Sequence, residues 1–422
     1  MIIIHIVNSY LNTRGRCMTG VIEKALGRSP VVVLTGARQT GKTTLVTSLI
    51  GEKRNFVTLD DIEALERAEK EPDSLLSSAL PLTIDEVQRS PNLLLAIKRL
   101  VDRGRVPGRF LLTGSANLAL FHRISESLAG RAVYKVMLPM TQSEIRGLGG
   151  CGKWGEVVKS PSSFEGMSLK NSWDWYEAVL KGGFPPAVFE VNDEARRDWL
   201  DGYVKTYLER DLRILSSVEH LPDFRRLIKI AALRTGYLMN QSDMARDAGL
   251  SQATAHRYFS LLEASYLLYR LPAYAANRTK RLIKAPRLFF CDTCLACFLA
   301  GIHTKEDCAG SEMKGMLLEN LVLNELLVWL ETTMPRPEIL YWRTADGREV
   351  DFVIEYGDTL TPVEVKASVK PRLADTAGLQ VFLEEYPHKA RHGILIHMGI
   401  QTERLTPKIW AIPLNMILGL SS

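Results

Sequence analysis

The residues best suited to chemistry lie in one glycine-rich run near the start of the chain, residues 36–44. The run follows an apolar stretch, residues 31–34, and precedes a stretch of helical character. The spacing G-x-x-x-x-G-K-[ST] is that of a P-loop, whose backbone N–H groups surround phosphate oxygens at the start of a helix. We therefore predict ATP and Mg²⁺ as cofactors, with Lys42 on the β- and γ-phosphates and Thr43 on the metal. The predicted cofactor-binding residues are Gly36, Ala37, Arg38, Gln39, Thr40, Gly41, Lys42, Thr43 and Thr44.

A second informative stretch is a mainly apolar strand, residues 81–84, that ends in Asp85 and Glu86. Strand alternation turns these two carboxylates to opposite sides. Asp85 would then hold the magnesium shell, and Glu86 would polarise the water that attacks the γ-phosphate. In isolation a solvated acidic turn would be the simpler explanation, but the P-loop upstream favours the catalytic interpretation.

Two further candidates follow a third predicted strand, residues 109–113. Because ligands bind at the carboxyl ends of parallel strands, the small polar residues Thr113, Ser115 and Asn117 are candidates to contact the γ-phosphate or the attacking water. We choose Ser115, with a plain turn as the alternative. Arg131 is a candidate arginine finger that would neutralise charge during phosphoryl transfer, and an exposed surface arginine is the alternative.

The order of four motifs resembles that of a large prokaryotic family of AAA-type ATPases: GARQTGKTT, LTIDEVQRSP, LLTGSAN and SLAGR. The likeness continues through residues 182–185, 207–212 and 349–353, so it covers nearly the whole chain. It implies a P-loop ATPase domain followed by a C-terminal domain of unassigned function, with Ser115 in the role called sensor 1. Residues 147–171, rich in Gly, Ser and Lys, depart from the likeness and are interpreted as a linker or insertion.

The middle of the chain carries a helix-turn-helix pattern. Residues 242–250 predict a short helix and a glycine turn, and residues 251–259 predict a serine-capped second helix. Two predicted strands, 267–271 and 288–290, enclose a basic loop that would form a wing. A winged helix predicts DNA binding, and a protein-contact lid is the alternative. The candidate DNA contacts are Gln252, Thr254, His256 and Arg257 in the groove, and Arg278, Lys280 and Arg281 on phosphates.

A second group of chemically active residues lies in the last hundred positions. Glu319 lies on a predicted amphipathic helix, Asp351 lies within a predicted strand, and Glu364 and Lys366 share one side of the next strand. This set resembles a PD-(D/E)xK nuclease, in which the carboxylates hold magnesium and the lysine orients or activates water. The alternative is a buried Lys–carboxylate network in a fold without catalysis.

Composition restricts the class of protein more than its activity. The 422 residues indicate two or three domains, and a net charge of +5 permits nucleic acid as a partner without arguing for it. No apolar stretch is long enough to cross a bilayer, so we expect no membrane contact and a cytoplasmic protein. Residues 1–17 carry little pattern and receive no role. Four cysteines invite an iron–sulfur interpretation, but their spacing favours small apolar residues of a helix: Cys291, Cys294, Cys297 and Cys308.

The sequence thus predicts an α/β protein: a P-loop NTPase parallel sheet, then a helical and winged-helix region, then a PD-(D/E)xK nuclease-like α/β domain. The predicted bounds are 1–146 for the ATPase domain, 147–235 for the linker and helical region, 236–290 for the winged helix and 291–422 for the nuclease-like domain. The predicted function is ATP hydrolysis with Mg²⁺, coupled to DNA binding or processing. The alternative is a nucleotide-gated switch that binds DNA or a protein partner, with a non-catalytic nuclease-like domain. The predicted partners are DNA, a protein partner or a second copy of the chain in a homo-oligomer.

Overall fold

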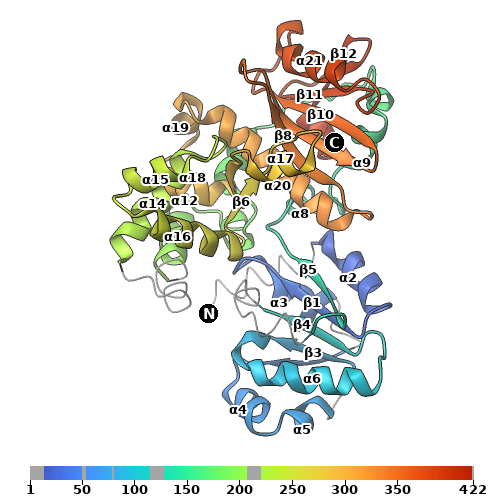
Figure 1. Ribbon diagram of the computed structural model, residues 1–422, viewed down its shortest axis with the longest axis vertical. Coiled ribbons are helices and arrows are strands. Elements are labelled where there is room, and N and C mark those ends of the chain that lie inside the picture. Colours follow the sequence, from blue (N-terminus) through green and yellow to red (C-terminus); the bar gives the residue numbers. More distant parts are fainter. Residues whose placement is uncertain (1–13, 50–53, 78–79, 115–127, 207–219, 421–422) are drawn as a thin grey trace.

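The computed structural model describes residues 14–49, 54–77, 80–114, 128–206 and 220–420. Figure 1 shows a parallel sheet at one end of the long axis and a mixed sheet at the other, with a group of helices beside the mixed sheet. Among the helices of these described ranges, none has both the length and the apolar character needed to span a bilayer.

The N-terminal sheet is parallel throughout and has the strand order β2-β3-β4-β1-β5. Its central strands are buried along their whole length, as expected for a sheet with helices on both faces. This confirms the predicted P-loop-type parallel sheet. The strands are β1 Val31–Thr35, β2 Asn55–Thr58, β3 Leu82–Asp85, β4 Phe110–Thr113 and β5 Ala132–Val136. The surrounding helices are α2 Met18–Leu26, α3 Lys42–Thr44, η1 Leu45–Leu49, α4 Ile62–Lys70, α5 Pro72–Ser77, η3 Val87–Arg89 and α6 Pro91–Arg103.

Residues 147–171 are folded, so of the two predicted alternatives the flexible linker is wrong and the insertion stands. They form α9 (Trp154–Lys159) and the turn η5 (Pro161–Phe164). Trp154 and Phe164 are each only 1% exposed, so their apolar surface is buried against the C-terminal half. The segment is also attached to that half by backbone hydrogen bonds, such as the one from Lys153 N to the carbonyl oxygen of Ile417 at 2.6 Å.

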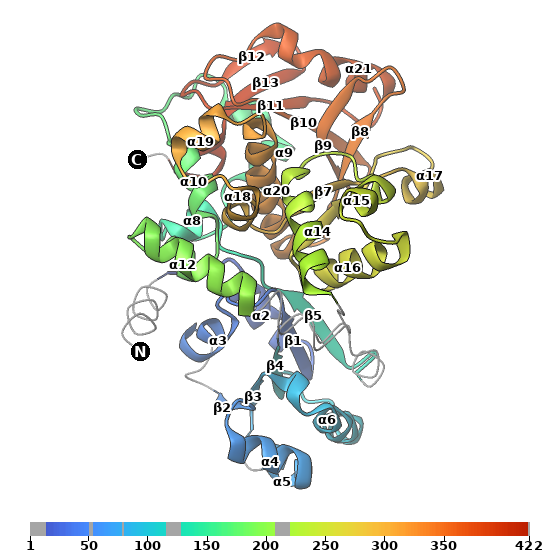
Figure 2. The ribbon, with the colours of Figure 1, turned by 90° about the vertical axis from the view of Figure 1, so that its left-hand side faces the viewer.

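The helical region packs beside the mixed sheet, as Figure 2 shows. The helices before the helix-turn-helix pattern are α8 Gln142–Ile145, α10 Trp175–Lys181, α11 Pro185–Val188, α12 Asp193–Tyr203 and α14 Leu221–Leu233. The two helices of the pattern form as predicted, as α15 (Gln241–Asp247) and α16 (Gln252–Ala264). Ser251 caps α16 by accepting a hydrogen bond from the backbone N–H of Thr254 at 3.1 Å.

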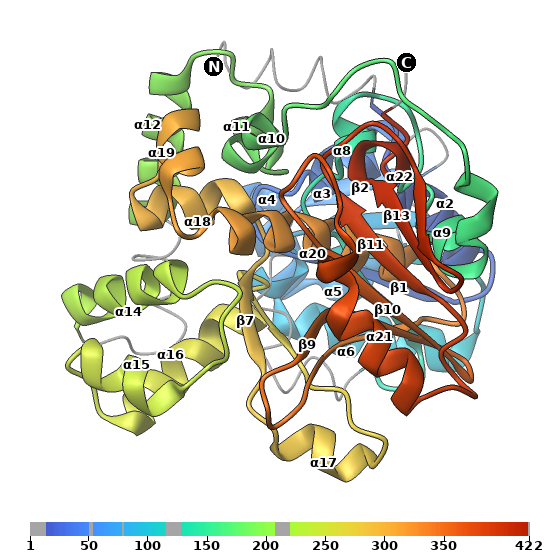
Figure 3. The ribbon, with the colours of Figure 1, turned by 90° about the horizontal axis from the view of Figure 1, so that it is seen from above.

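Strands β6 (Leu268–Leu271) and β7 (Arg287–Phe290) pair antiparallel, as expected for the strands around a wing. Their connection, however, contains the short helix α17 (Arg278–Ile283), which Figure 3 shows at the periphery of the molecule. The side chain of Asn277 starts this helix by accepting from two backbone N–H groups, so the predicted basic loop is wrong in conformation.

The C-terminal sheet has the order β12-β13-β11-β10-β9-β8, with parallel pairs β10–β11 and β11–β13 and the other pairs antiparallel. Apolar residues of α20 lie in the large core with one face of the sheet, and those of α21 lie in a separate cluster with the other face. The strands are β8 Glu338–Arg343, β9 Glu349–Tyr356, β10 Thr359–Val365, β11 Gly393–His397, β12 Glu403–Thr406 and β13 Ile409–Pro413. The helices are α18 Thr293–Ala300, α19 Lys305–Gly310, α20 Lys314–Thr332, η7 Leu373–Thr376, α21 Ala377–Glu385 and α22 Leu414–Ile417.

One hydrophobic core runs across the boundaries predicted at 236 and 291. It joins buried residues from Trp154 in the folded segment, through Phe259 of α16, to Leu418 near the end of the chain. The parallel sheet has its own two clusters, one on each face. The helical region and the C-terminal sheet therefore share one packed interior, which Ala37 of the P-loop also joins, while the parallel sheet packs mainly in its own two clusters.

Candidate functional site

The loop between β1 and α3 needs glycine at both glycine positions of the P-loop motif, Gly36 and Gly41. Gly36 has φ +142°, and a Cβ added there would lie 2.1 Å from the carbonyl oxygen of Met137. Gly41 has φ +92° and is the N-cap of α3. Side chains are strained at such positive φ values, so the backbone can turn its N–H groups inward only with glycine at these positions. The geometry is that of a phosphate-binding loop at the start of a helix.

Lys42 is folded against this loop. Its Nζ donates to the carbonyl oxygens of Gly36 at 3.1 Å and Ala37 at 2.8 Å, and the residue is only 7% exposed. Burial lowers the pKa of Lys42 to about 8, and the carboxylates of Glu86 and Asp85 limit that fall. The lysine is therefore close to losing its charge at mildly alkaline pH.

This pKa leads to a prediction for nucleotide binding. Phosphates would favour the charged lysine, so above pH 8 binding takes up a proton, and the association constant for ATP should fall about tenfold per pH unit. Titration calorimetry between about pH 8 and 9.5 measures this slope. In Lys42→Arg the cation does not titrate in this range, so its affinity should not change with pH. An equally flat profile in the wild type would contradict the role of Lys42.

Asp85 joins the P-loop to the neighbouring strand. One of its oxygens accepts a hydrogen bond from the hydroxyl of Thr43 at 2.9 Å, and the other accepts from the hydroxyl of Thr113 at the end of β4. The strand order places β4 between β1 and β3, which is why Thr113 reaches Asp85. A hydroxyl and a carboxylate held side by side are the protein ligands that Mg²⁺ takes when phosphates and water complete its octahedron. Thr43 and Asp85 thus fit a magnesium ion bound with a nucleotide.

Glu86 follows Asp85 with a left-handed backbone, φ 54°, and lies half-buried. Gln88 donates a hydrogen bond to one of its carboxylate oxygens. Burial raises the pKa of Glu86, with a further contribution from the charge of Asp85. A carboxylate with a raised pKa is a stronger base, which suits the role of polarising a water molecule.

The remaining two catalytic candidates are Ser115 and Arg131, and neither is seen at the P-loop. Ser115 lies outside the described residues, and Thr113 is the polar residue of that strand end whose contact is seen. Arg131 immediately precedes β5, whose first residue pairs with the first residue of β1. The P-loop follows the last residue of β1, so Arg131 lies at the opposite ends of the strands from the P-loop. It forms a two-point ion pair with Asp102 of α6, at 2.6 and 2.9 Å. Within one chain Arg131 therefore does not reach the P-loop, and a role as a finger would need a second copy.

Arg16, which lies in the N-terminal segment that received no predicted role, holds the P-loop in place. The residue is 8% exposed, and its guanidinium donates to the carbonyl oxygens of Thr40 at 2.8 Å and Leu138 at 2.9 Å. The buried carboxylate of Glu144 lies 3.1 Å away and balances the charge. No local pattern could reveal this residue, because its partners lie 24 and 122 positions along the chain.

The four residues of the predicted nuclease site do come together, with an arginine among them. Arg287 at the start of β7 forms ion pairs with Glu319, and with Asp351 at 3.5 Å. Asp351 also accepts from the backbone N–H of Val365 at 2.9 Å. Glu364 pairs with Lys366 at 2.6 Å, and its other oxygen is buried without a hydrogen-bond partner.

The charges in this ion network perturb one another. Burial and the neighbouring Asp351 raise the pKa of Glu319 to about 8 and that of Glu364 well above its usual range. Burial opposes the charge on Lys366, but Glu364 outweighs it and raises the pKa of that lysine. Among the described residues, no three His, Cys, Asp or Glu side chains are grouped so that they could hold a metal ion. The cluster therefore does not fit the predicted magnesium site, because the guanidinium of Arg287 already lies between two of the carboxylates.

The candidate DNA contacts divide into two sets. Gln252, His256 and Arg257 are exposed on α16, and Thr254 is partly buried at its first turn. Arg278 and Lys280 are exposed on α17.

Arg281 does not fit its predicted role, and that prediction is wrong. The residue is 8% exposed, its guanidinium bonds both oxygens of Glu355 at 2.5 and 3.2 Å, and it lies over the ring of Tyr274. A guanidinium held in this way is not available to a phosphate.

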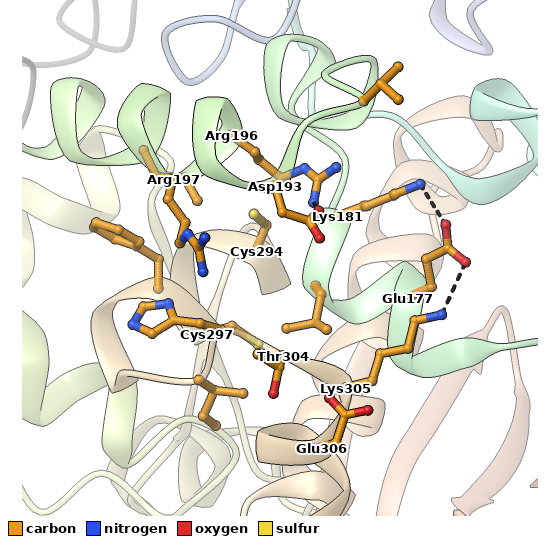
Figure 4. Close-up of a pocket in the computed structure, with 16 residues that line it drawn as sticks. Glu177, Lys181, Asp193, Arg196, Arg197, Cys294, Cys297, Thr304, Lys305 and Glu306 are labelled. Carbon is orange, nitrogen blue, oxygen red and sulfur yellow. Dashed lines mark hydrogen bonds and ion pairs between the residues drawn. The ribbon is translucent and has the colours of Figure 1, made fainter.

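Figure 4 shows a cavity of about 620 Å³ between α10, α12, α18 and α19. Lys181 and Lys305 reach opposite oxygens of Glu177 there, at 2.5 and 3.5 Å. Cys294 and Cys297 line the cavity from α18, and both are almost fully buried. Burial raises the pKa of each thiol well above its usual range, as expected for small apolar residues of a helix rather than metal ligands.

Comparison with protein families matches three stretches of the chain. Residues 28–146 match an AAA domain, residues 172–306 match a domain of unknown function (DUF8612), and residues 314–417 match another (DUF4143). Together with the loop, Asp85 and the strand order, the first match defines a P-loop nucleotide-binding protein of the AAA type.

Two curated relatives are uncharacterized proteins of Mycobacterium tuberculosis and Mycobacterium bovis. Each is 31% identical over 403 residues, which are 95% of this chain and 84% of the relative. The protein belongs to the same family as these mycobacterial proteins.

Among solved structures, one similar chain is a Walker-type ATPase of Pyrococcus abyssi, at 14% identity, with 67% of this chain and 94% of that chain covered and a TM-score of 0.43. Another is Cdc6p of Pyrobaculum aerophilum, at 12% identity, with 69% and 93% covered and a TM-score of 0.24. At these TM-scores neither likeness bears on function.

Proposed function

We propose that this protein binds and hydrolyses ATP with Mg²⁺ at its P-loop and transmits the nucleotide state to its C-terminal half. The observation that carries the proposal is the link from Thr43 to Asp85 to Thr113, which joins the loop to both neighbouring strand ends. Lys42 would bind the β- and γ-phosphates, Thr43 and Asp85 would hold the metal, and Glu86 would polarise the attacking water. The magnesium ion would supply charge neutralisation between the phosphates.

Contacts between the P-loop body and the C-terminal half support transmission. The hydroxyl of Thr35, the residue before the P-loop, lies 2.9 Å from that of Tyr266, which follows α16 and has a φ of 56°. Pro185 lies beside Gly41 of the loop, and the buried carboxylate of Asp292 fixes the turn before that proline by accepting from Gly183 N at 2.6 Å. A phosphate that moves the loop would therefore press directly on the helical region.

Removal of the charge of Lys42 by substitution tests nucleotide binding. In Lys42→Ala the phosphates lose their nearest cation, so the dissociation constant for ATP should rise by about 100-fold, or about 2.8 kcal/mol. Titration calorimetry measures it at about pH 7.5, with Lys24→Ala, an exposed lysine of α2, as the matched control. Equal affinities of the two variants would refute the P-loop assignment.

A second function, binding to duplex DNA, is favoured by the exposed polar face of α16. Arg257→Ala combined with Arg278→Ala should weaken duplex binding and reduce the salt slope by about 1.8, since each lost phosphate contact removes about 0.9 of a released counterion. Fluorescence anisotropy at several salt concentrations measures both quantities. The control is a pair of exposed arginines on the P-loop domain, Arg28→Ala with Arg67→Ala. If the two pairs behave alike, α16 is a protein-contact surface and the alternative of a nucleotide-gated switch stands.

A further inference from the structure

Two of the six cysteines differ from the others in exposure and position. Four are buried, whereas Cys17 and Cys151 are partly exposed. The thiols of these two residues are hydrogen-bonded to each other, although 134 positions separate them in the sequence. Sγ of Cys151 also lies 3.4 Å from the hydroxyl of Thr332 at the end of α20.

Backbone contacts show independently that the two segments lie side by side. The backbone N–H of Cys17 donates to the carboxylate of Glu144 at 2.6 Å. A Cβ added to Gly147 would lie 2.5 Å from the guanidinium of Arg14. Residues 14–17, which precede α2, therefore pack against residues 144–151, and the thiol contact is part of that packing.

The surroundings give the two thiols different reactivity. The hydrogen bond from Cys17 lowers the pKa of Cys151, and the positive charge of Arg16 acts in the same direction. That same hydrogen bond, with burial and the charge of Glu144, raises the pKa of Cys17. Because the thiolate is the nucleophile, Cys151 is the thiol that reacts first.

We propose that Cys17 and Cys151 form a reversible disulfide that fastens the P-loop body to the C-terminal half. The oxidant is a small-molecule disulfide such as oxidised glutathione. The Cys151 thiolate attacks one of its sulfurs and releases one glutathione thiolate, leaving glutathione bound to Cys151. Cys17 then loses its proton to solvent and attacks Sγ of Cys151, which releases the second glutathione. Two protein thiols are oxidised to one disulfide, and one glutathione disulfide is reduced to two thiols.

The position of this bond gives it a consequence for the P-loop. Cys17 is the neighbour of Arg16, which holds the carbonyl oxygen of Thr40. Cys151 contacts α20 through Thr332, and two residues later the backbone of Lys153 is bonded to Ile417. The disulfide would therefore fix Arg16, and through it the P-loop, relative to the C-terminal half. We expect this constraint to slow nucleotide turnover. Only this last expectation rests on the proposed ATPase activity.

Peptide mapping of the full-length protein tests the bond. The native protein is incubated with oxidised glutathione, its remaining thiols are alkylated under denaturing conditions, and it is digested with trypsin. Trypsin releases Cys17 within residues 17–24 and Cys151 within residues 147–153. We expect these two peptides joined, with the other four cysteines alkylated. Cys17→Ser should instead retain glutathione on Cys151, and Cys151→Ser should leave Cys17 free.

One result would overturn the disulfide itself, and another would overturn its effect on the P-loop. One is a wild-type protein in which both peptides stay separate, whether free or carrying glutathione. The other is a joined pair whose ATP turnover equals that of the reduced protein, since we expect a fall of about fivefold or more that dithiothreitol reverses and that Cys151→Ser does not show. A reduced protein without any turnover would refute the proposed function alone, because the peptide map remains decisive for the disulfide.

Discussion

Glu86→Gln should bind ATP with nearly wild-type affinity and hydrolyse it at least about 100-fold more slowly. The amide keeps the shape of the side chain but has no basic oxygen with which to polarise water. Burial raises the pKa of the native carboxylate, so the lost group is a stronger base than an exposed glutamate would be. Lys42 and the pair Thr43–Asp85 remain in place, which is why affinity is retained.

Phosphate release under saturating ATP measures the rate, and calorimetric titration measures affinity. Glu63→Gln, an exposed acid in the first turn of α4, removes the same charge away from the loop and should turn over like the wild type. A Glu86→Gln protein that hydrolyses ATP at the wild-type rate would show that another group activates the water.

Arg287→Ala should lower the free energy of unfolding by about 3–5 kcal/mol. The change leaves the carboxylates of Glu319 and Asp351 buried without their shared cation. The carboxylate of Glu319 avoids a buried charge by binding a proton, so the loss of stability should be smaller at about pH 6 than at about pH 9. The sign follows because the pKa of Glu319 is already raised to about 8 and rises further when the cation is removed.

Urea unfolding at the two pH values measures this loss, and Arg348→Ala, which removes an exposed arginine, is the control. A metal site behaves in the opposite way. There, Mg²⁺ or Mn²⁺ would raise the melting temperature of the wild type, and Asp351→Asn would remove that response with little loss of stability. A wild-type melting curve that moves with Mn²⁺ would contradict the ion network and restore the nuclease interpretation.

Local patterns were sufficient for the P-loop and for most elements around it. The strands β1, β3 and β4 are mainly apolar and buried along their whole length because both faces of the sheet are covered, and such apolar stretches are visible in a sequence. Asp61 illustrates such a local pattern, since its carboxylate caps α4 by accepting a hydrogen bond from Ala64 N at 2.9 Å.

The remainder depends on partners that lie far apart in the chain. Arg287 meets Asp351 across 64 positions, and neither residue alone shows whether a carboxylate faces a metal ion or a guanidinium. The segment 147–171 has the composition of a linker, but its few large apolar residues, such as Trp154, find a place in the shared core. Arg281 belongs to a basic run, yet Glu355, 74 positions away, holds it. Composition cannot report such pairings, because they are set by tertiary packing.

A single-turnover reaction tests the central claim most directly. Protein in excess over radiolabelled ATP is mixed with Mg²⁺, the reaction is stopped in acid at increasing times, and ATP and ADP are separated. We expect wild-type protein to convert the bound ATP to ADP and phosphate only when Mg²⁺ is present, and Glu86→Gln to leave the same bound ATP intact. Wild-type protein that binds ATP and returns it unchanged would contradict the account.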